Sequence, residues 1–330
     1  MAIRSVHDLP TPSLLLDMEA VDRNIQALGR ALPGARLRPH VKAHKCTSIA
    51  QRQFEAGHRS FCCATIREME GLAAVGLGED LLLANEVLDA RRLGALDARV
   101  TVAVDSRETV RAAFEGGVSE VLIDINVGLP RCGCAPEDAR ALADQARSLG
   151  LKVRGVMGYE GHVMGITSRE ERYAGCIESM RILREAHSEV GGEVVSAGGT
   201  GTWDFDTGAT EIQAGSYVLM DTAYAKSALP FEQAFWVWAT VISVSKEYAV
   251  ADCGLKAFGM DHGNPSVEGA RIWFCSDEHL TFSSQSSIRV GDRIRVTPAH
   301  VDPTVAYHES FYVVQGDEVV DQWPIDLRGW

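Results

Sequence analysis

The sequence predicts an α/β protein that joins a closed (β/α)8 barrel of the TIM type to a β-rich C-terminal domain. Strand-like and helical segments alternate through the first two-thirds of the chain, with successive strands roughly 20 to 25 residues apart, the length of one βα unit. No Gly-rich dinucleotide fingerprint follows the first strand. About eight such units favour a closed barrel, and an open doubly wound sheet is the alternative.

The predicted barrel strands are short apolar runs rich in β-branched residues. They are Ser13–Asp17, Leu37–Lys42, Ser60–Ala64, Leu81–Asn85, Val100–Asp105, Glu120–Asn126, Val153–Tyr159, Glu193–Ala197 and Glu211–Ala214. Amphipathic segments between several of them are predicted helices: Val21–Ala31, Ser48–Ala56, Ile66–Val75, Arg107–Glu115 and Pro136–Leu149. These elements assign residues 10–225 to the barrel domain.

After Tyr224 the pattern changes to strands and turns, with no convincing helix between them. The predicted strands are Phe235–Ser245, Glu247–Asp252, Ala270–Phe274, Leu280–Ser283, Asp292–Pro298 and Phe311–Val320. Residues 226–330 are therefore a β-rich domain, which residues 1–9 and the first strand can join because they precede the first barrel helix.

Composition narrows the classes of function. The chain has 330 residues, of which 46% are hydrophobic and 23% charged, as in an ordinary globular protein. The net charge of -13 argues against a nucleic-acid surface. No run approaches the roughly 20 apolar residues of a membrane span, and no signal peptide is evident, so we expect a cytoplasmic protein. The eight cysteines are expected to be buried small hydrophobes rather than a disulfide framework.

Two lysines and two histidines crowd the segment Arg38–Cys46, at the end of an early predicted strand. Barrel enzymes place catalytic groups at that face. A lysine among cationic neighbours and partly desolvated has a lowered pKa and can form a Schiff base. A solvated basic turn explains the same residues about equally well.

Two segments after late strands suit a phosphate. Ser196–Thr202 contains three glycines and flanking hydroxyls, which let backbone N–H groups approach a phosphate closely. Gln213–Tyr217 follows the next strand and can add donors. Tight turns use the same residues, so this pattern alone is weak.

Other polar groups follow predicted strands or lie in the β-rich domain. Arg131 and His162 come after two neighbouring strands and would face the same mouth, as an anion-binding group and a ring-binding or ring-stacking group. His300 and Asp302 are two apart, so on an extended backbone their side chains leave one face and form a half-site for a divalent ion such as Mn²⁺ or Zn²⁺. The alternatives are that Arg131 is an ordinary surface arginine, that His162 is a histidine with its hydrogen bonds satisfied, and that the segment with His300 and Asp302 is an exposed loop.

Taken together, five segments in order resemble the fold-type III pyridoxal-phosphate enzymes, in particular the group of D-threonine aldolase, D-3-hydroxyaspartate aldolase and D-serine dehydratase. The segments are Pro39–Lys45, Gly158–His162, Gly199–Thr202, Asp252–Ala257 and Pro298–Pro303. The resemblance runs from about Asp8 to the C-terminus. It implies pyridoxal 5'-phosphate (PLP), a divalent metal and a homodimer.

The resemblance also implies roles for individual residues. Lys42, and not Lys45, matches the lysine that links covalently to the cofactor, and Arg131 matches the arginine near its phenolic oxygen. The other cofactor-binding residues are Tyr159, Gly199, Thr200, Gly201, Gln213, Gly215 and Ser216. His300 and Asp302 match the metal pair, and the catalytic residues are Lys42, His162 and His300.

One residue difference favours an aldolase over a dehydratase, and another disfavours a related racemase. The dehydratases carry His-x-Cys at the metal site and the aldolases His-x-Asp, as in His300-x-Asp302 here. Related racemases carry arginine where this chain has Gln213. The resemblance therefore implies cleavage of a D-β-hydroxy amino acid such as D-threonine to glycine and an aldehyde, with Mn²⁺, Zn²⁺, Mg²⁺ or Co²⁺. The alternatives are a dehydratase, acting on D-serine or D-threo-3-hydroxyaspartate, and a non-enzymatic cofactor carrier or regulator.

Overall fold

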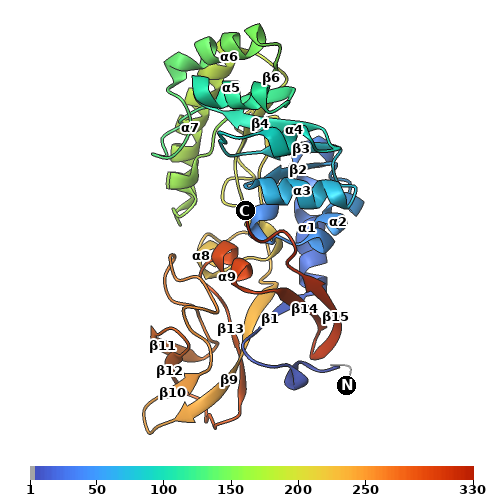
Figure 1. Ribbon diagram of the computed structural model, residues 1–330. Coiled ribbons are helices and arrows are strands. Elements are labelled where there is room, and N and C mark those ends of the chain that lie inside the picture. The colour runs from blue at the N-terminus through green and yellow to red at the C-terminus, as the bar shows by residue number, and fades with distance from the viewer. Residues whose placement is uncertain (1–3) are drawn as a thin grey trace. The chain divides into compact units, whose positions relative to one another are not determined.

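The protein divides into two compact units in a computed structural model that describes residues 4–330 (Figure 1). The barrel unit comprises Leu28–Lys42, Ile49–Gly215 and Leu327–Trp330. The sheet unit comprises Met1–Ala27, Ala43–Ser48 and Ser216–Asp326. Each unit therefore combines segments that are far apart in the sequence.

The barrel unit is built on seven parallel strands that pair in the order of the chain. They are β2 (Ser60–Cys63), β3 (Asp80–Leu83), β4 (Val100–Val104), β5 (Glu120–Asp124), β6 (Lys152–Met157), β7 (Val194–Ala197) and β8 (Glu211–Ile212). The helices of the chain up to β7 are α1 (Met18–Ala31), α2 (Thr47–Glu55), α3 (Ile66–Ala74), α4 (Arg91–Gly94), α5 (Arg107–Glu115), α6 (Ala139–Ser148) and α7 (Arg169–Val190). Short 3-10 turns are η1 (Val6–Asp8), η2 (Gly34–Arg36), η3 (Val41–Ala43), η4 (Pro136–Asp138), η5 (Gly161–Val163) and η6 (Ser216–Val218).

The segment at 37–40 closes the curled sheet between its first and last strands. Leu37 bridges Ile212 on β8, and His40 bridges Cys62 on β2, both in parallel orientation. The prediction of a continuous strand over Leu37–Lys42 is wrong, because the segment forms only isolated bridges and turns into η3 at Val41. Pro39 has no N–H to donate, which explains the interrupted ladder. The predicted closed barrel is nevertheless confirmed, with this segment in the eighth position.

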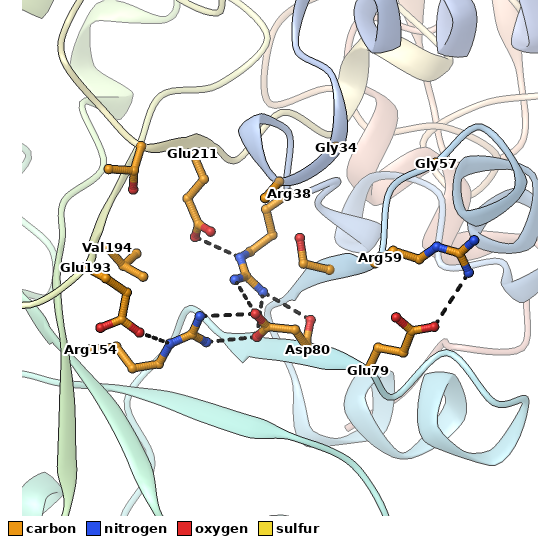
Figure 2. A pocket seen from close by; sticks show the side chains of 13 residues that line it. Gly34, Arg38, Gly57, Arg59, Glu79, Asp80, Arg154, Glu193, Val194 and Glu211 are labelled. Carbon is orange, nitrogen blue, oxygen red and sulfur yellow. Dashed lines mark hydrogen bonds and ion pairs between the residues drawn. The ribbon is translucent and has the colours of Figure 1, made fainter.

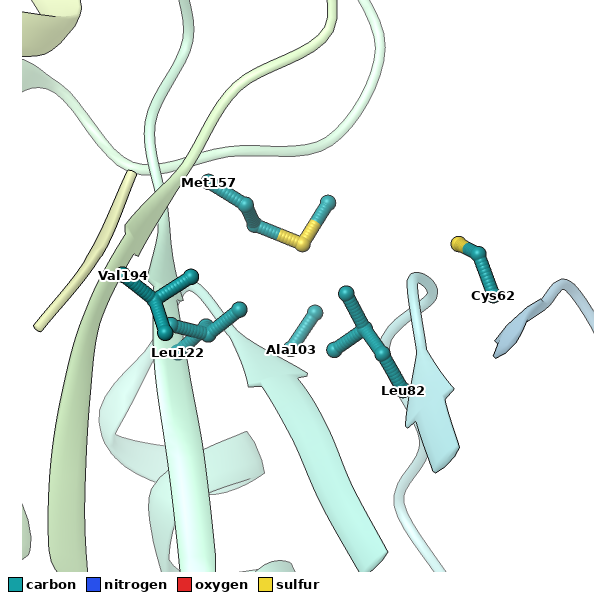
Figure 3. Packing of buried hydrophobic residues seen from close by; sticks show 6 residues of the cluster. All are labelled: Cys62, Leu82, Ala103, Leu122, Met157 and Val194. Carbon is teal, nitrogen blue, oxygen red and sulfur yellow. The ribbon is translucent and has the colours of Figure 1, made fainter. Parts of the chain in front are cut away.

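The inside of the barrel is filled by side chains from consecutive strands (Figure 3). One residue from each of β2 to β7 joins the cluster: Cys62, Leu82, Ala103, Leu122, Met157 and Val194. All six are at most 5% exposed. Such a layer of inward-pointing side chains makes the barrel a packed core rather than a pore, so chemistry must take place at its ends.

The sheet unit contains one mixed sheet in the order β11-β12-β10-β9-β1-β14-β15, with β13 also paired to β9. Its strands are β1 (Ser13–Asp17), β9 (Phe235–Val244), β10 (Ala249–Ala251), β11 (Ala270–Cys275), β12 (Leu280–Ser284), β13 (Arg293–Val296), β14 (Ser310–Gln315) and β15 (Glu318–Pro324). β1 runs parallel to β14 and antiparallel to β9. The first strand of the chain therefore belongs to this sheet.

The structure corrects the prediction that no helix follows Tyr224. Besides the short α8 (Thr222–Ala225), residues Val301–Tyr307 form α9, with His300 as its N-cap. Pro303 is the third residue of this helix, where its missing N–H costs nothing. The predicted strand Phe311–Val320 is also two strands, β14 and β15, joined by a turn in which Gly316 has a φ of 61°. Over residues 4–330 no helix is both long and apolar enough to span a membrane.

Candidate active site

The predicted cofactor residues of the barrel unit lie where parallel strands end. Arg131 comes after β5, Tyr159 after β6, Gly199 after β7, and Gln213 after β8. Lys42 follows the bridging segment at 37–40 in the same direction. Because the carboxyl ends of parallel barrel strands meet at one mouth, the topology brings these five residues to the same end of the barrel.

The basic segment around Lys42 is not a solvated turn. Lys42 is partly buried in η3, and its backbone N–H donates to His40 Nδ1 at 3.4 Å. His40 is 8% exposed and His44 is fully buried. Arg38, predicted as part of the same cluster, is 2% exposed and its guanidinium is paired at the opposite, amino-terminal end of the barrel. The basic side chains of this segment are therefore buried or half-buried and are not exposed together.

Arg131 and Tyr159 contact each other at the mouth. The guanidinium carbon of Arg131 lies 5.3 Å from the centroid of the Tyr159 ring. His162 is exposed and packs against Gly128. A Cβ on Gly128 would lie 3.0 Å from the imidazole carbon Cε1, and the φ of Gly128 is 123°. Glycine is therefore required at position 128 both for its backbone conformation and for the space that His162 takes.

The Gly-rich loop after β7 is packed tightly on side chains of the β6 connection. A Cβ on Gly199 would lie 3.1 Å from Met164 Cε and 3.5 Å from Tyr159 Cε2. A Cβ on Gly201 would lie 3.1 Å from Met164 Sδ. A side chain at either glycine would have to displace the end of the Met164 side chain, so this loop packs closely, which fits a backbone cradle for a phosphate.

Two buried charged residues hold the loop, and neither was identified from the sequence. Glu160, 1% exposed, accepts hydrogen bonds from the Gly198 N–H at 3.2 Å and from Thr202 Oγ1 at 2.7 Å. Arg172, also 1% exposed, donates from Nε to the Gly201 carbonyl at 2.8 Å. Glu160 lies inside the motif Gly158–His162, but nothing in that motif indicates that its carboxylate would bind the Gly-rich loop.

Gln213 presents a fixed, neutral side chain. Its Nε2 donates to Ser196 Oγ at 2.8 Å, and its Oε1 accepts from the thiol of Cys62 at 3.2 Å. Burial raises the pKa of the Cys62 thiol, so the thiol remains a donor at neutral pH. Gly215 and Ser216 follow, both buried, and Ser216 begins η6.

The predicted metal pair is present in the sheet unit, but on a different backbone from that expected. His300 Nε2 and Asp302 Oδ2 are 3.6 Å apart, and both side chains are about 20% exposed. They meet as N-cap and second residue of α9, not as neighbours on an extended strand. The Val301 N–H donates to Asp221 Oδ2 at 3.0 Å, which fixes the start of the helix. Burial raises the pKa of Asp221.

Two further acidic residues and a thiol gather at the mouth of the barrel. Glu86, Asp105 and Cys132 offer ligand atoms within 4.8 Å of one another. A hydrogen bond to Glu86, together with burial, raises the pKa of Cys132 to about 11. Cys132 is exposed and Cys275 half-buried, so the expectation that all cysteines are buried is wrong for these two. The eight cysteines are all free thiols, as expected.

The amino-terminal end of the barrel is closed by ion pairs (Figure 2). Arg38 Nε lies 2.7 Å from Glu211 Oε1, and Arg154 Nη1 lies 2.8 Å from Asp80 Oδ1. Arg38 also pairs with Asp80 at 3.2 Å. These groups line a pocket of about 420 Å³, and their charges are satisfied by one another. This end therefore offers no converging set of unpaired charges for a cofactor.

Comparison with known proteins identifies the family to which the chain belongs. The family described as alanine racemase, N-terminal domain, matches residues 16–223, and a serine dehydratase domain family matches residues 234–314. A D-threonine aldolase from an Arthrobacter species is 35% identical over 97% of this chain and 93% of that protein. A 3-hydroxy-D-aspartate aldolase from Paracoccus denitrificans is 30% identical over 98% of this chain and 93% of that protein.

A solved structure extends the likeness to the whole fold. The crystal structure of D-threonine aldolase from Filomicrobium marinum superimposes with a TM-score of 0.93 at 33% identity, covering 100% of this chain and 98% of that chain. The resemblance inferred from five short motifs is thereby confirmed. The chain belongs to the alanine racemase N-terminal domain family and is a homologue of D-threonine aldolase, a lyase.

Proposed function

We propose that this chain is a PLP- and metal-dependent lyase that cleaves D-β-hydroxy amino acids such as D-threonine to glycine and an aldehyde. The observation that carries the proposal is the meeting of an imidazole nitrogen and a carboxylate oxygen at His300 and Asp302, 3.6 Å apart. One nitrogen and one oxygen ligand leave coordination positions open for water and substrate, which is typical of a catalytic rather than a structural site.

The residues at the mouth of the barrel fit a phosphorylated pyridine cofactor. Lys42 would hold it covalently, and the packed loop at Gly199, Thr200 and Gly201 would hold its phosphate, together with Gly215 and Ser216. Arg131, Tyr159 and Gln213 would contact the ring and its oxygen. Bound PLP supplies an electron sink for the pair released when the Cα–Cβ bond breaks.

His300 and Asp302 would hold a divalent ion, with Mn²⁺ as our first choice and Zn²⁺, Mg²⁺ or Co²⁺ as alternatives. A ligand pair of imidazole and carboxylate, without thiolate, suits borderline and hard cations. Such an ion stabilises negative charge on the β-hydroxyl oxygen of a substrate. His162 is exposed at the mouth and is our candidate for the base that takes the hydroxyl proton.

The proposal also covers the substrate, the location and oligomeric state of the protein, and its domain boundary, which rest on the family and on the sequence. The substrate is a small D-amino acid, the protein is a cytoplasmic homodimer, and the functional domains divide at residues 225 and 226. The competing reaction is a dehydration, in which the hydroxyl leaves after loss of the Cα proton. The carboxylate of Asp302, in place of a thiolate, favours the aldolase.

The test is an assay of products with the purified, PLP-loaded chain. D-threonine with Mn²⁺ should yield equal amounts of acetaldehyde and glycine, and a chelator should stop the reaction. Asp302→Ala should lose this activity, whereas Asp317→Ala should keep it, because Asp317 is 71% exposed and lies away from the pair in the sequence. Ammonia and a 2-oxo acid as products would make the enzyme a dehydratase, and cleavage that survives both the chelator and Asp302→Ala would contradict the metal site.

A further inference from the structure

We propose that Asp261 is a positioning residue for His300: it accepts the hydrogen bond from the Nδ1–H of His300 and so fixes the opposite ring nitrogen, Nε2, as the metal ligand. This inference rests on the proposed function, because it concerns the same metal pair. It adds a residue that the sequence did not single out and that lies 39 positions before His300.

The two nitrogens of His300 have different partners. Nδ1 lies 2.7 Å from Asp261 Oδ2, a short hydrogen bond, whereas Nε2 lies 3.6 Å from Asp302 Oδ2. A neutral imidazole carries one proton, and the nitrogen that meets a carboxylate at 2.7 Å keeps it. Nε2 then presents its lone pair on the side of Asp302. Metal-binding histidines commonly donate their other N–H to a carboxylate in this way, which sets the tautomer and the ring orientation.

A second histidine fixes the plane of the ring. The His262 ring stacks on His300 with 3.8 Å between centroids and 14° between planes. His262 Nε2 is 3.9 Å from the same Asp261 oxygen. Asp261 and His262 together thus restrain the His300 imidazole at its edge and on its face.

The loop that carries Asp261 is attached to the first turn of α9. The Gly259 N–H donates to Thr304 Oγ1 at 3.0 Å, and the same hydroxyl donates to the His300 carbonyl at 2.7 Å. A Cβ on Gly259 would lie 2.2 Å from Pro303 Cγ, so only glycine allows this approach. The position of Asp261 relative to His300 is therefore set by the backbone on both sides and does not depend on the exposed carboxylate alone.

The alternative to a positioning role is that Asp261 binds the metal directly. Asp261, His262 and His300 place ligand atoms within 4.8 Å of one another and could themselves bind a cation. In that arrangement Nδ1 would be the ligand, and Asp261 and His262 would be as necessary as His300. In the arrangement we propose, Asp302 is indispensable, Asp261 tunes the affinity, and His262 contributes little to it.

The experiment measures Mn²⁺ binding to the full-length, PLP-loaded protein by electron paramagnetic resonance titration. Asp261→Ala should bind Mn²⁺ about 10 to 100 times more weakly than the unmodified protein. Asp261→Asn keeps an acceptor oxygen and should recover most of this loss. His262→Ala should change the affinity by less than about threefold, and Asp302→Ala should abolish specific binding. Asp317→Ala is the matched control for removing an acid from the sheet unit.

Activity at saturating Mn²⁺ separates positioning from a general structural effect. The Asp261→Ala protein should approach the kcat of the unmodified protein when enough Mn²⁺ is added, with an unchanged melting temperature and PLP absorbance. Unchanged Mn²⁺ affinity in Asp261→Ala would overturn the inference, and so would abolished binding in both Asp261→Ala and His262→Ala. If the unmodified protein binds Mn²⁺ but releases no aldehyde, the proposed function fails while a weakened Asp261→Ala still supports the inference.

Discussion

Arg38 and Lys42 lie only four residues apart in the sequence but belong to opposite ends of the barrel. The two ends differ in the role of their charged side chains. Arg38 lies at the amino-terminal end, 2% exposed, and its guanidinium bonds Glu211 and Asp80. Lys42 lies at the carboxyl end, where the loops after the strands gather the predicted cofactor residues. The chain runs parallel to β8 and β2 through the bridges at Leu37 and His40, and it then turns into η3, which contains Lys42.

The difference lies in how the charges are satisfied. At the amino-terminal end each buried cation meets carboxylates within the barrel unit, as Arg154 does with Asp80 at 2.8 Å (Figure 2). At the carboxyl end Arg131 is exposed, its guanidinium carbon lies 5.3 Å from the centroid of the Tyr159 ring, and its charge lowers the pKa of the Asp124 carboxyl, which burial raises overall. Buried ion pairs between arginines and carboxylates stabilise the amino-terminal end, whereas the carboxyl end carries the residues that we propose to bind the cofactor. The same residue types therefore predict stability at one end and chemistry at the other.

The largest effect is expected from Lys42→Ala. We expect loss of the visible absorbance of the bound cofactor and a fall in kcat/KM of about 10³-fold or more, equivalent to about 4 kcal/mol of transition-state stabilisation. The melting temperature should change little, because Lys42 is partly exposed and lies at the mouth. Absorbance spectra, steady-state kinetics and thermal unfolding of the same preparation measure the three quantities.

Lys45→Asn is the matched control for this variant. Lys45 has a φ of 46°, a left-handed conformation that asparagine tolerates, and it does not match the cofactor lysine. The control should keep the absorbance and the activity. Retained absorbance in Lys42→Ala together with its loss in Lys45→Asn would reverse the assignment of the two lysines.

For Asp80→Asn at the amino-terminal end we expect a loss of stability without a loss of activity. The substitution keeps the side-chain volume but leaves Arg38 and Arg154 without one of their carboxylate partners, so we expect a loss of about 3 to 5 kcal/mol in the free energy of unfolding. Specific activity of the folded protein should be unchanged. Chemical denaturation measures the loss, with Glu79→Gln as control.

Glu79 is the adjacent residue, but it is 55% exposed and pairs with Arg59 at 3.5 Å on the surface of the same pocket. Its neutralisation should therefore cost no more than about 1 kcal/mol. Equal losses in the two variants would mean that burial does not distinguish these ion pairs.

The barrel was predictable because the same pattern, a short apolar strand followed by a helical segment, recurs along the sequence. β3 to β7 are short apolar runs at regular spacing, and the structure places them within a few residues of the predicted bounds. Two of the failures occur where proline interrupts a local pattern, and a third occurs at Gly316, where a turn divides the predicted strand Phe311–Val320. Pro39 breaks the ladder of a segment that otherwise resembles a strand, and Pro303 lies in the first turn of a helix that resembles a loop.

The candidate site was predictable only where its residues are near one another in the sequence. His300 and Asp302 were identified as a pair, although the argument from an extended backbone was wrong and the helix N-terminus brings them together instead. Asp261 and Arg172 were missed because each acts on a residue about 30 to 40 positions away, at His300 and Gly201. No local periodicity encodes such a contact, which arises only when separate elements pack.

The smallest effect we predict is in the acid dependence of stability. Burial opposes ionisation of Asp80, but its bonds to Arg154 and Arg38 outweigh this and lower its pKa from 3.8 to about 2. Because the folded pKa is the lower one, Asp80 stabilises the protein fully above pH 4, and this contribution, roughly 2 kcal/mol, is lost as the pH falls from about 4 to 2. The difference in unfolding free energy between the unmodified protein and Asp80→Asn should thus narrow by about 1 kcal/mol between pH 6 and pH 3. Urea denaturation across that range measures it, and a difference that stays constant or widens would show that the arginines do not hold Asp80 ionised.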